Sequence, residues 1–101
     1  MAMINHVVLF KLKEYPKTEK EAVLLKIKTA LEALKDKIEQ VRHIEVGLNY
    51  ELEAKSYDLC LISHFDSVAD LDVYRVHPEH LKVVSLIQET TVERAAVDYE
   101  F

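Results

Sequence analysis

The sequence contains few of the residues that most readily reveal a protein's class. Its 101 residues include one glycine, two prolines, one cysteine and no tryptophan. Half of the residues are hydrophobic and 31% are charged. Together with the small number of glycines and prolines, this composition excludes disordered, collagen-like and low-complexity proteins. A chain of this length is expected to form a single domain, 1–101, because it is too short for two.

The single cysteine and the lack of long apolar runs exclude further classes. One cysteine, Cys60, allows neither an internal disulfide bond nor a cysteine-based zinc site. Its neighbours Leu59 and Leu61 predict a buried packing residue rather than a nucleophile. The apolar runs are too short for a membrane span, and no basic region precedes the first strand-like segment, so we expect no signal peptide. A cytoplasmic location fits these features.

The charges do not indicate a polyanionic partner. Thirteen lysines and arginines stand against 18 aspartates and glutamates, which gives a formal net charge of −5. Between residues 17 and 37 the lysines alternate with acidic residues, a pattern typical of a solvated helix. We therefore expect no nucleic-acid partner and no membrane partner.

Hydrophobic periodicity predicts the order of the elements. Alternating apolar residues predict strands at 4–12, 41–49, 57–65 and 94–101. Capping and proline signals predict helices from Thr18 to about Lys37, from Ser67 to about His77, and from Pro78 to about Thr90. The order β-α-β-β-α-β predicts a ferredoxin-like α+β fold, in which helices cover one face of a four-stranded antiparallel sheet.

The first strand has apolar side chains on both of its faces. One face carries Ile4, His6, Val8, Phe10 and Leu12, and the other carries Asn5, Val7, Leu9 and Lys11. Helices can cover only one side of such a sheet, which would leave a broad apolar surface on the other side. The pattern therefore predicts that the partner of this chain is a second copy of itself, packed face to face as a homodimer.

Three polar residues interrupt apolar faces and are candidates for chemistry. His6 lies within the apolar face of the first strand, His80 shares a helix face with Val83 and Ile87, and Tyr74 follows Leu71 by one helical turn. A phenol beside an imidazole can act as an acid/base pair. Alternatively, Tyr74 and His80 bond only to each other and fix the helix corner. His77 and His80 lack a third ligand, so no metal site is predicted.

Four segments of the sequence resemble one known family. They are His6-Val7-Val8-Leu9-Phe10-Lys11, Val46-Gly47-x-Asn49, Tyr57…His64-Phe65-Asp66-Ser67 and Tyr74-x-x-His77-Pro78-x-His80. Together they resemble the stress-responsive A/B-barrel (Dabb) domain family over residues 4–100. The resemblance implies a homodimer whose two sheets form an α/β barrel.

The resemblance extends more distantly to plant polyketide cyclases of that family, which work without a cofactor. It implies catalytic roles for His80 and Tyr74 and a pocket position for His6, while a further pocket histidine of the cyclases falls on Leu59 here. The expected sites are then catalytic His80 and Tyr74, and substrate-binding His6, Val8, Phe10, Leu59 and His77.

The function expected from these residues is the binding of a small hydrophobic or aromatic molecule. The same site allows a cofactor-free lyase or cyclase reaction with a His–Tyr acid/base pair, and no cofactor is expected. Two alternatives stay open, a non-catalytic structural dimer related to stress and a monooxygenase-like dimeric barrel enzyme.

Overall fold

The computed structural model describes residues 2–51 and 55–101. The strands are β1 (Ile4–Leu12), β2 (His43–Leu48), β3 (Leu59–Phe65) and β4 (Thr91–Glu100), and the helices are α1 (Lys17–Glu32), α2 (Leu34–Lys37), α3 (Val68–Val76) and α4 (Pro78–Thr90). The strands form one sheet in the order β2-β3-β1-β4, and all neighbouring strands are antiparallel. This is the ferredoxin-like α+β arrangement, so the predicted fold class is confirmed.

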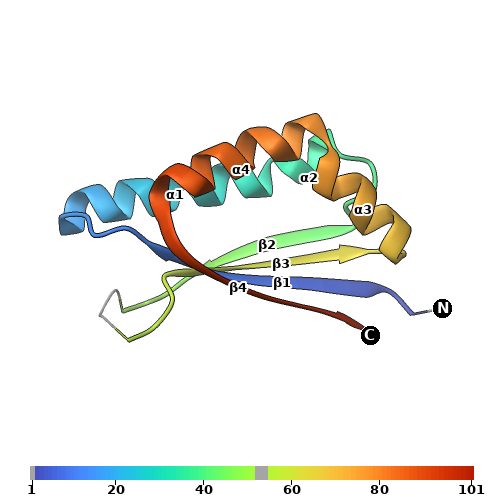
Figure 1. The fold of residues 1–101 in the computed structure, drawn as a ribbon, viewed down its shortest axis with the longest axis horizontal. Coiled ribbons are helices and arrows are strands. Elements are labelled where there is room, and N and C mark those ends of the chain that lie inside the picture. Colours follow the sequence, from blue (N-terminus) through green and yellow to red (C-terminus); the bar gives the residue numbers. More distant parts are fainter. Residues whose placement is uncertain (1, 52–54) are drawn as a thin grey trace.

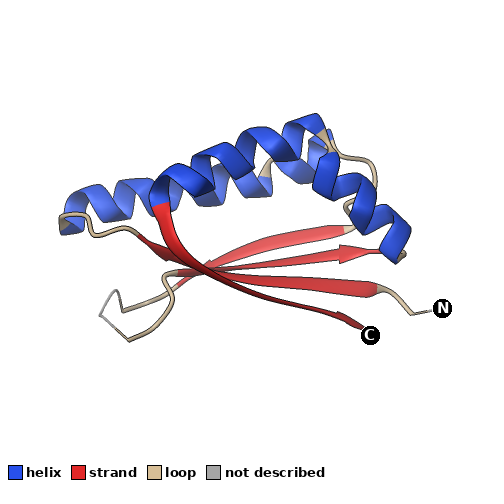
Figure 2. Ribbon diagram, in the orientation of Figure 1, coloured by secondary structure: helices blue, strands red, loops and turns tan. Residues whose placement is uncertain are grey.

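All of these helices lie on the same face of the sheet, and the opposite face is bare (Figure 1, Figure 2). Side chains of β1 alternate between buried and more exposed along the strand, as its sequence predicts. The core between sheet and helices is built from Ile4, Val8, Phe10, Leu12, Leu24, Ile27, Leu31, Leu34, Ile38, Val41, Val46, Leu59, Leu61, Phe65, Leu71, Tyr74, Val83 and Ile87. Among the described residues, no helix is both long and apolar enough to cross a membrane.

The bare side, here called the open face, is defined by the strand register. Val7 pairs with Ile62 on β3 and with Val97 on β4, and Leu9 pairs with Cys60 and Ala95. Because paired residues of neighbouring strands project to the same side, these side chains gather on the open face. Several of its large apolar groups are exposed, among them Leu9, Val97 and Tyr99. The two-faced pattern predicted for β1 is therefore present.

Several element boundaries differ from the prediction. Strand β2 spans His43–Leu48 rather than 41–49, β3 begins at Leu59 rather than at 57, and three further differences have a local cause. Helix α1 begins at Lys17, not at a Thr18 cap, because the Pro16 carbonyl accepts the first helical hydrogen bond. The helix is interrupted at Ala33, where Asp36 donates to the Ala33 carbonyl in a tighter turn. Strand β4 begins at Thr91, directly after α4, since Thr91 already pairs with β1.

Other local signals act as predicted. The Ser67 side chain accepts a hydrogen bond from the Asp70 amide and caps α3, and Pro78 occupies the first turn of α4. Gly47 marks a close approach rather than a bulge, because a Cβ there would lie 3.2 Å from the Cys60 Sγ on the neighbouring strand. Cys60 itself is half-buried, not fully buried as predicted, since it lies on the open face.

A buried carboxylate joins β1, β3 and α1 at one end of the sheet. Asp58 is only 1% exposed, and its Oδ1 lies 3.0 Å from the Lys20 Nζ. Its Oδ2 accepts a hydrogen bond of 2.7 Å from the Leu12 amide, and its own amide donates to the Phe10 carbonyl. Removal of this carboxylate would leave a buried amide and an ammonium group without their partner.

We expect Asp58→Ala to lower the free energy of unfolding by about 3 kcal/mol, in the range for breaking a buried ion pair. Asp66→Ala is the matched control, because Asp66 also pairs with a cation, Arg42, but both side chains are about half exposed. That control should lose less than about 1 kcal/mol. Urea unfolding followed by circular dichroism measures both values, and equal losses would contradict the structural role of Asp58.

Candidate functional site

A cavity of about 260 Å³ lies between the helix-covered face of the sheet and the helices. Its wall consists of His6, Val8 and Phe10 from β1, Leu61 from β3, Arg94 from β4, Leu31 from α1, Arg75 from α3, and His80, Val84, Ile87 and Gln88 from α4. Most of this wall is apolar, with a few polar groups converging on it, which is typical of small-molecule sites.

His6 is held by a carboxylate on the neighbouring strand. The register of β1 and β4 places His6 opposite Asp98, and the His6 Nδ1 lies 2.5 Å from the Asp98 Oδ1. The other oxygen of Asp98 accepts a hydrogen bond of 2.9 Å from the Arg75 guanidinium. A carboxylate can only accept, so Nδ1 carries the proton and Nε2 of the neutral ring has the free lone pair.

His80 is held in the same tautomer by the backbone. It lies in the first turn of α4, and its Nδ1 is 3.1 Å from the carbonyl oxygen of Arg75, near the end of α3. Carbonyls in the last turn of a helix lack helical partners, and a carbonyl only accepts. Nδ1 of His80 is therefore the donor, and its Nε2 is the free base.

Burial keeps both imidazoles uncharged at neutral pH. Loss of solvation lowers the pKa of His6, and this effect exceeds the opposing influence of the bonded Asp98. Loss of solvation also lowers the pKa of His80, although its bond to the Arg75 carbonyl acts in the opposite direction. The cavity wall thus contains two neutral bases, each oriented by a bond at its other nitrogen.

Tyr74 lies directly behind these bases. Its side chain is fully buried, with ring centroids 4.2 Å from His80 and 6.3 Å from His6. Burial raises the pKa of the Tyr74 hydroxyl well above 10, so the phenol stays protonated. Within residues 2–51 and 55–101 this hydroxyl has no hydrogen-bond partner, which leaves a buried donor next to two imidazoles.

Comparison with known proteins shows the family of this chain. The sequence matches the family described as Stress responsive A/B Barrel Domain (Dabb) over residues 4–101. The chain belongs to this family. The family resemblance of the sequence is therefore confirmed.

One curated relative and two solved structures indicate how far the similarity of this Dabb chain reaches. The stress-response A/B barrel domain-containing protein DABB1 of Arabidopsis thaliana is 28% identical over 103 residues, which cover 97% of this chain and 47% of that protein. The chain thus spans about half the length of this curated relative.

Among solved structures, a dimeric protein of unknown function with a ferredoxin-like fold from Bacteroides fragilis is 44% identical. It has a TM-score of 0.89, and the match covers 98% of this chain and 96% of that chain. The hydroxynitrile lyase of Passiflora edulis is 14% identical, with a TM-score of 0.76 and coverage of 98% and 93%. At 14% identity the likeness concerns the fold alone.

The fold of the Dabb chain brings most of the predicted site residues together. His6, Val8, Phe10 and His80 line one cavity, and Tyr74 contacts its two histidines from behind. Their chemical roles stay predictions. Among the described residues, no group of three or more His, Cys, Asp or Glu side chains could hold a metal ion.

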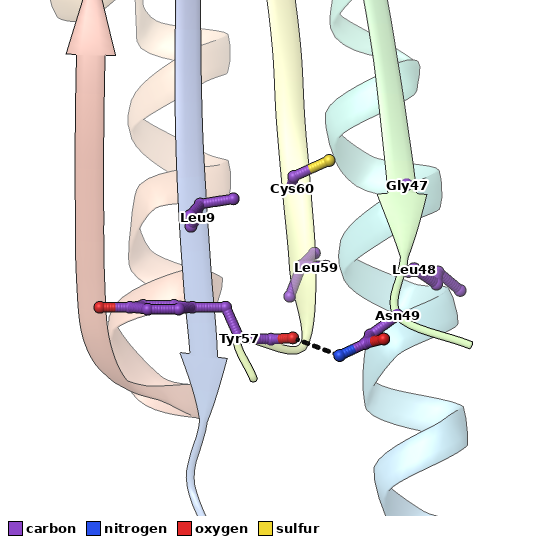
Figure 3. A pocket seen from close by; sticks show the side chains of 7 residues that line it. All are labelled: Leu9, Gly47, Leu48, Asn49, Tyr57, Leu59 and Cys60. Atoms are coloured by element: carbon purple, nitrogen blue, oxygen red, sulfur yellow. Dashed lines mark hydrogen bonds between the residues drawn. The ribbon is translucent and has the colours of Figure 1, made fainter. Parts of the chain in front are cut away.

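Two predicted substrate-binding residues lie elsewhere. Leu59 lines a different pocket, of about 220 Å³, which also includes Leu9 and Cys60 of the open face (Figure 3), although it pairs with Phe10 of the cavity wall. His77 does not line the cavity either. Its Nδ1 accepts a hydrogen bond from the Glu79 amide and caps α4, so its place in the motif reflects the helix corner.

The charged residues of the site are not predicted from the sequence. Arg75, Arg94 and Gln88 line the cavity, and Asp98 orients His6. One signal was present, since Arg94 and Asp98 are four residues apart and share the strand face opposite to Val97 and Tyr99. Charged residues on a strand face that helices cover indicate either a cavity or a buried ion pair. Which of the two is present depends on the register between β1 and β4, and strands so far apart in the sequence do not reveal their register locally.

The histidine environment predicts a pH dependence of stability. In the folded chain the pKa of His6 and that of His80 lie below the ordinary value of 6.5, so around and below this pH the unfolded chain binds more protons. The free energy of unfolding should therefore fall as the pH is lowered from about 7.5 to about 5.5. His6→Gln and His80→Gln should each reduce this slope in urea-unfolding series, and an unchanged slope in both would contradict the assignment.

Proposed function

We propose that this protein is a homodimer that binds a small, largely apolar molecule in the cavity and catalyses cofactor-free acid/base chemistry on it, of the lyase or cyclase type. The observation that carries the proposal is the pair of neutral imidazoles in the apolar wall, each with Nδ1 bonded and Nε2 free. Oriented bases and a protonated phenol are the groups that general acid/base catalysis requires.

The homodimer is supported by the open face. Its exposed apolar groups, including Val97 at 56% and Tyr99 at 47% exposure, are of the kind that proteins usually cover with a partner. Two identical faces can pack isologously about a two-fold axis. The relative from Bacteroides fragilis, of the same fold and 44% identical, is dimeric, which agrees with this packing of two sheets into a barrel.

The proposed chemistry moves one proton within the substrate. Nε2 of His80 accepts a proton from a substrate hydroxyl or an acidic carbon. Because Tyr74 is buried and does not line the cavity, its hydroxyl can donate a hydrogen bond to the developing oxyanion only when a ring in the wall moves aside as the substrate binds. For a hydroxynitrile, the hydroxyl proton passes to Nε2, the carbon–carbon bond breaks to leave a carbonyl, and the departing cyanide takes the proton. No oxidant, reductant or external group is needed for this balance.

The two histidines differ in their distance from Tyr74, which supports different roles for them. His80 contacts Tyr74 ring to ring at 4.2 Å, whereas the His6 ring lies 6.3 Å from Tyr74 and is bonded to Asp98. We therefore assign His80 as the base paired with Tyr74, and His6 as a second polar contact for the substrate.

We expect Tyr74→Phe to lower the activity of the protein without lowering its stability. Since the Tyr74 hydroxyl has no partner among the described residues, its removal should leave the melting temperature unchanged or slightly raised. Ligand-induced stabilisation or turnover should fall by about 10- to 100-fold. Thermal shifts and product analysis would use a hydroxynitrile as the lyase probe and a linear aromatic polyketide analogue as the cyclase probe.

Tyr50→Phe is the matched control, because Tyr50 is almost fully exposed and should behave like the wild type. His80→Ala should abolish turnover of any probe that the wild type converts. A non-catalytic structural dimer would instead respond to no probe, or would respond equally in the wild type and in both Tyr74→Phe and His80→Ala. Either of these results would overturn the catalytic proposal.

The dimer proposal predicts that a charge on the open face separates the protomers. Val97→Lys should lower the mass measured by light scattering from about twice 11.7 kDa to that of one chain, because a lysine would be buried without a partner. Val73→Lys is the matched control, since Val73 is 43% exposed on the outer side of α3. A monomeric wild type, or a dimeric Val97→Lys variant, would contradict the proposed interface.

A further inference from the structure

The charged side chains of the cavity wall all have the same sign. The whole chain has a formal net charge of −5, yet the two charged residues among those that line the cavity, Arg75 and Arg94, are both cationic. A cationic group in a cavity wall favours an anionic ligand wherever its charge is not already balanced by a carboxylate.

The two arginines differ in how their charges are balanced. Arg75 forms ion pairs with Asp72, at 3.0 Å, and with Asp98, at 2.9 Å. Arg94 forms no ion pair with any residue in the described ranges 2–51 and 55–101. Its guanidinium donors therefore remain available for a ligand, whereas those of Arg75 are engaged in holding Asp98 and, through it, His6.

The topology places Arg94 at the opposite end of the cavity from the bases. On β1 and β4, Arg94 pairs with Phe10 while Asp98 pairs with His6, and four residues along a strand span about 13 Å. On α4, His80 and Gln88 are eight residues apart, which corresponds to about 12 Å. Since α4 leads directly into the antiparallel return of β4, Gln88 and Arg94 share one end and the two histidines share the other.

From this arrangement we infer that the ligand is a carboxylic acid with an apolar or aromatic body, whose carboxylate binds Arg94 and Gln88 while its far end reaches Nε2 of His6 and His80. The inference rests on the proposed function and names its substrate class. A guanidinium presents paired N–H donors that match the two oxygens of a carboxylate, and the Gln88 amide can add a further donor. Val8, Phe10 and Ile87 then contact the body of the ligand.

The cationic wall is compatible with two neutral bases. Burial is the main cause of the lowered pKa of His6 and His80, and the positive charge of Arg94 acts in the same direction on both rings. Arg94 is itself exposed, so the cavity reaches solvent at this residue. An anionic head group can remain partly hydrated there while the apolar body enters the site.

The test compares two probes of nearly the same shape, the anionic 6-hydroxy-2-naphthoate and the neutral 6-hydroxy-2-naphthamide, by titration calorimetry at pH 7.5. The wild type should bind the carboxylate about tenfold more tightly than the amide, as expected for a charge-assisted bond near solvent. Arg94→Gln should remove this preference and weaken carboxylate binding about tenfold, with less than a twofold effect on the amide. Arg94→Lys should retain an intermediate preference, because the charge remains but the paired donors are lost.

Arg42→Gln is the matched control, since it removes one positive charge from an exposed position that does not line the cavity, and its affinities should equal those of the wild type. His80→Ala should weaken both probes alike, because it acts at the far end. If the wild type and Arg94→Gln bind both probes equally well, the carboxylate inference is wrong while ligand binding in the cavity stands. If the wild type binds neither probe, the inference and the proposed binding of aromatic molecules both fail.

Discussion

The structure depends on one constraint, the alternation of side chains along the central strand β1. Both of its neighbours, β3 and β4, take their register from it, so its alternation divides the whole sheet into two faces. Helices cover the face that carries His6, Val8 and Phe10, whereas the face with Val7 and Leu9 stays open. The cavity lies on one face of this strand and the proposed dimer interface on the other. A shift of one residue in the register of β1 would move each set of side chains to the opposite face.

The covered face shows how a small domain holds polar groups in an apolar interior. The polar groups that it encloses are bonded to partners: His6 is bonded to Asp98, His80 to the Arg75 carbonyl, and Asp58 to Lys20 and the Leu12 amide. These bonds offset the loss of solvation and also fix orientation. The Tyr74 hydroxyl departs from this rule among the described residues. A buried donor without a partner is costly, and its position beside two imidazoles is consistent with a group kept for a ligand.

Sequence patterns could find His6, His80 and Tyr74 because each of them interrupts a local apolar periodicity, which is readable within about ten residues. The capping signals at Ser67 and Pro78 are equally local. Leu59 and His77 were assigned to the site through the family motif, and the structure places them in another pocket and at a helix cap. The roles of Asp98 and Arg94 are not predictable from the sequence, because the residues that they face on β1 are far away in the chain. Which residues of β1 and β4 lie opposite each other depends on the strand register rather than on neighbouring residues.

The sequence by itself determined the order of the elements, the ferredoxin-like fold, the family and the two-faced nature of β1, since all of these follow from short-range periodicity and motifs. The tertiary structure decided which nitrogen of each histidine is bonded, which arginine remains available, and that the histidines and Arg94 occupy opposite ends of one cavity. The physical reason is that tautomers, ion pairs and burial depend on atoms brought together from β1, α3, α4 and β4. No single segment contains that information.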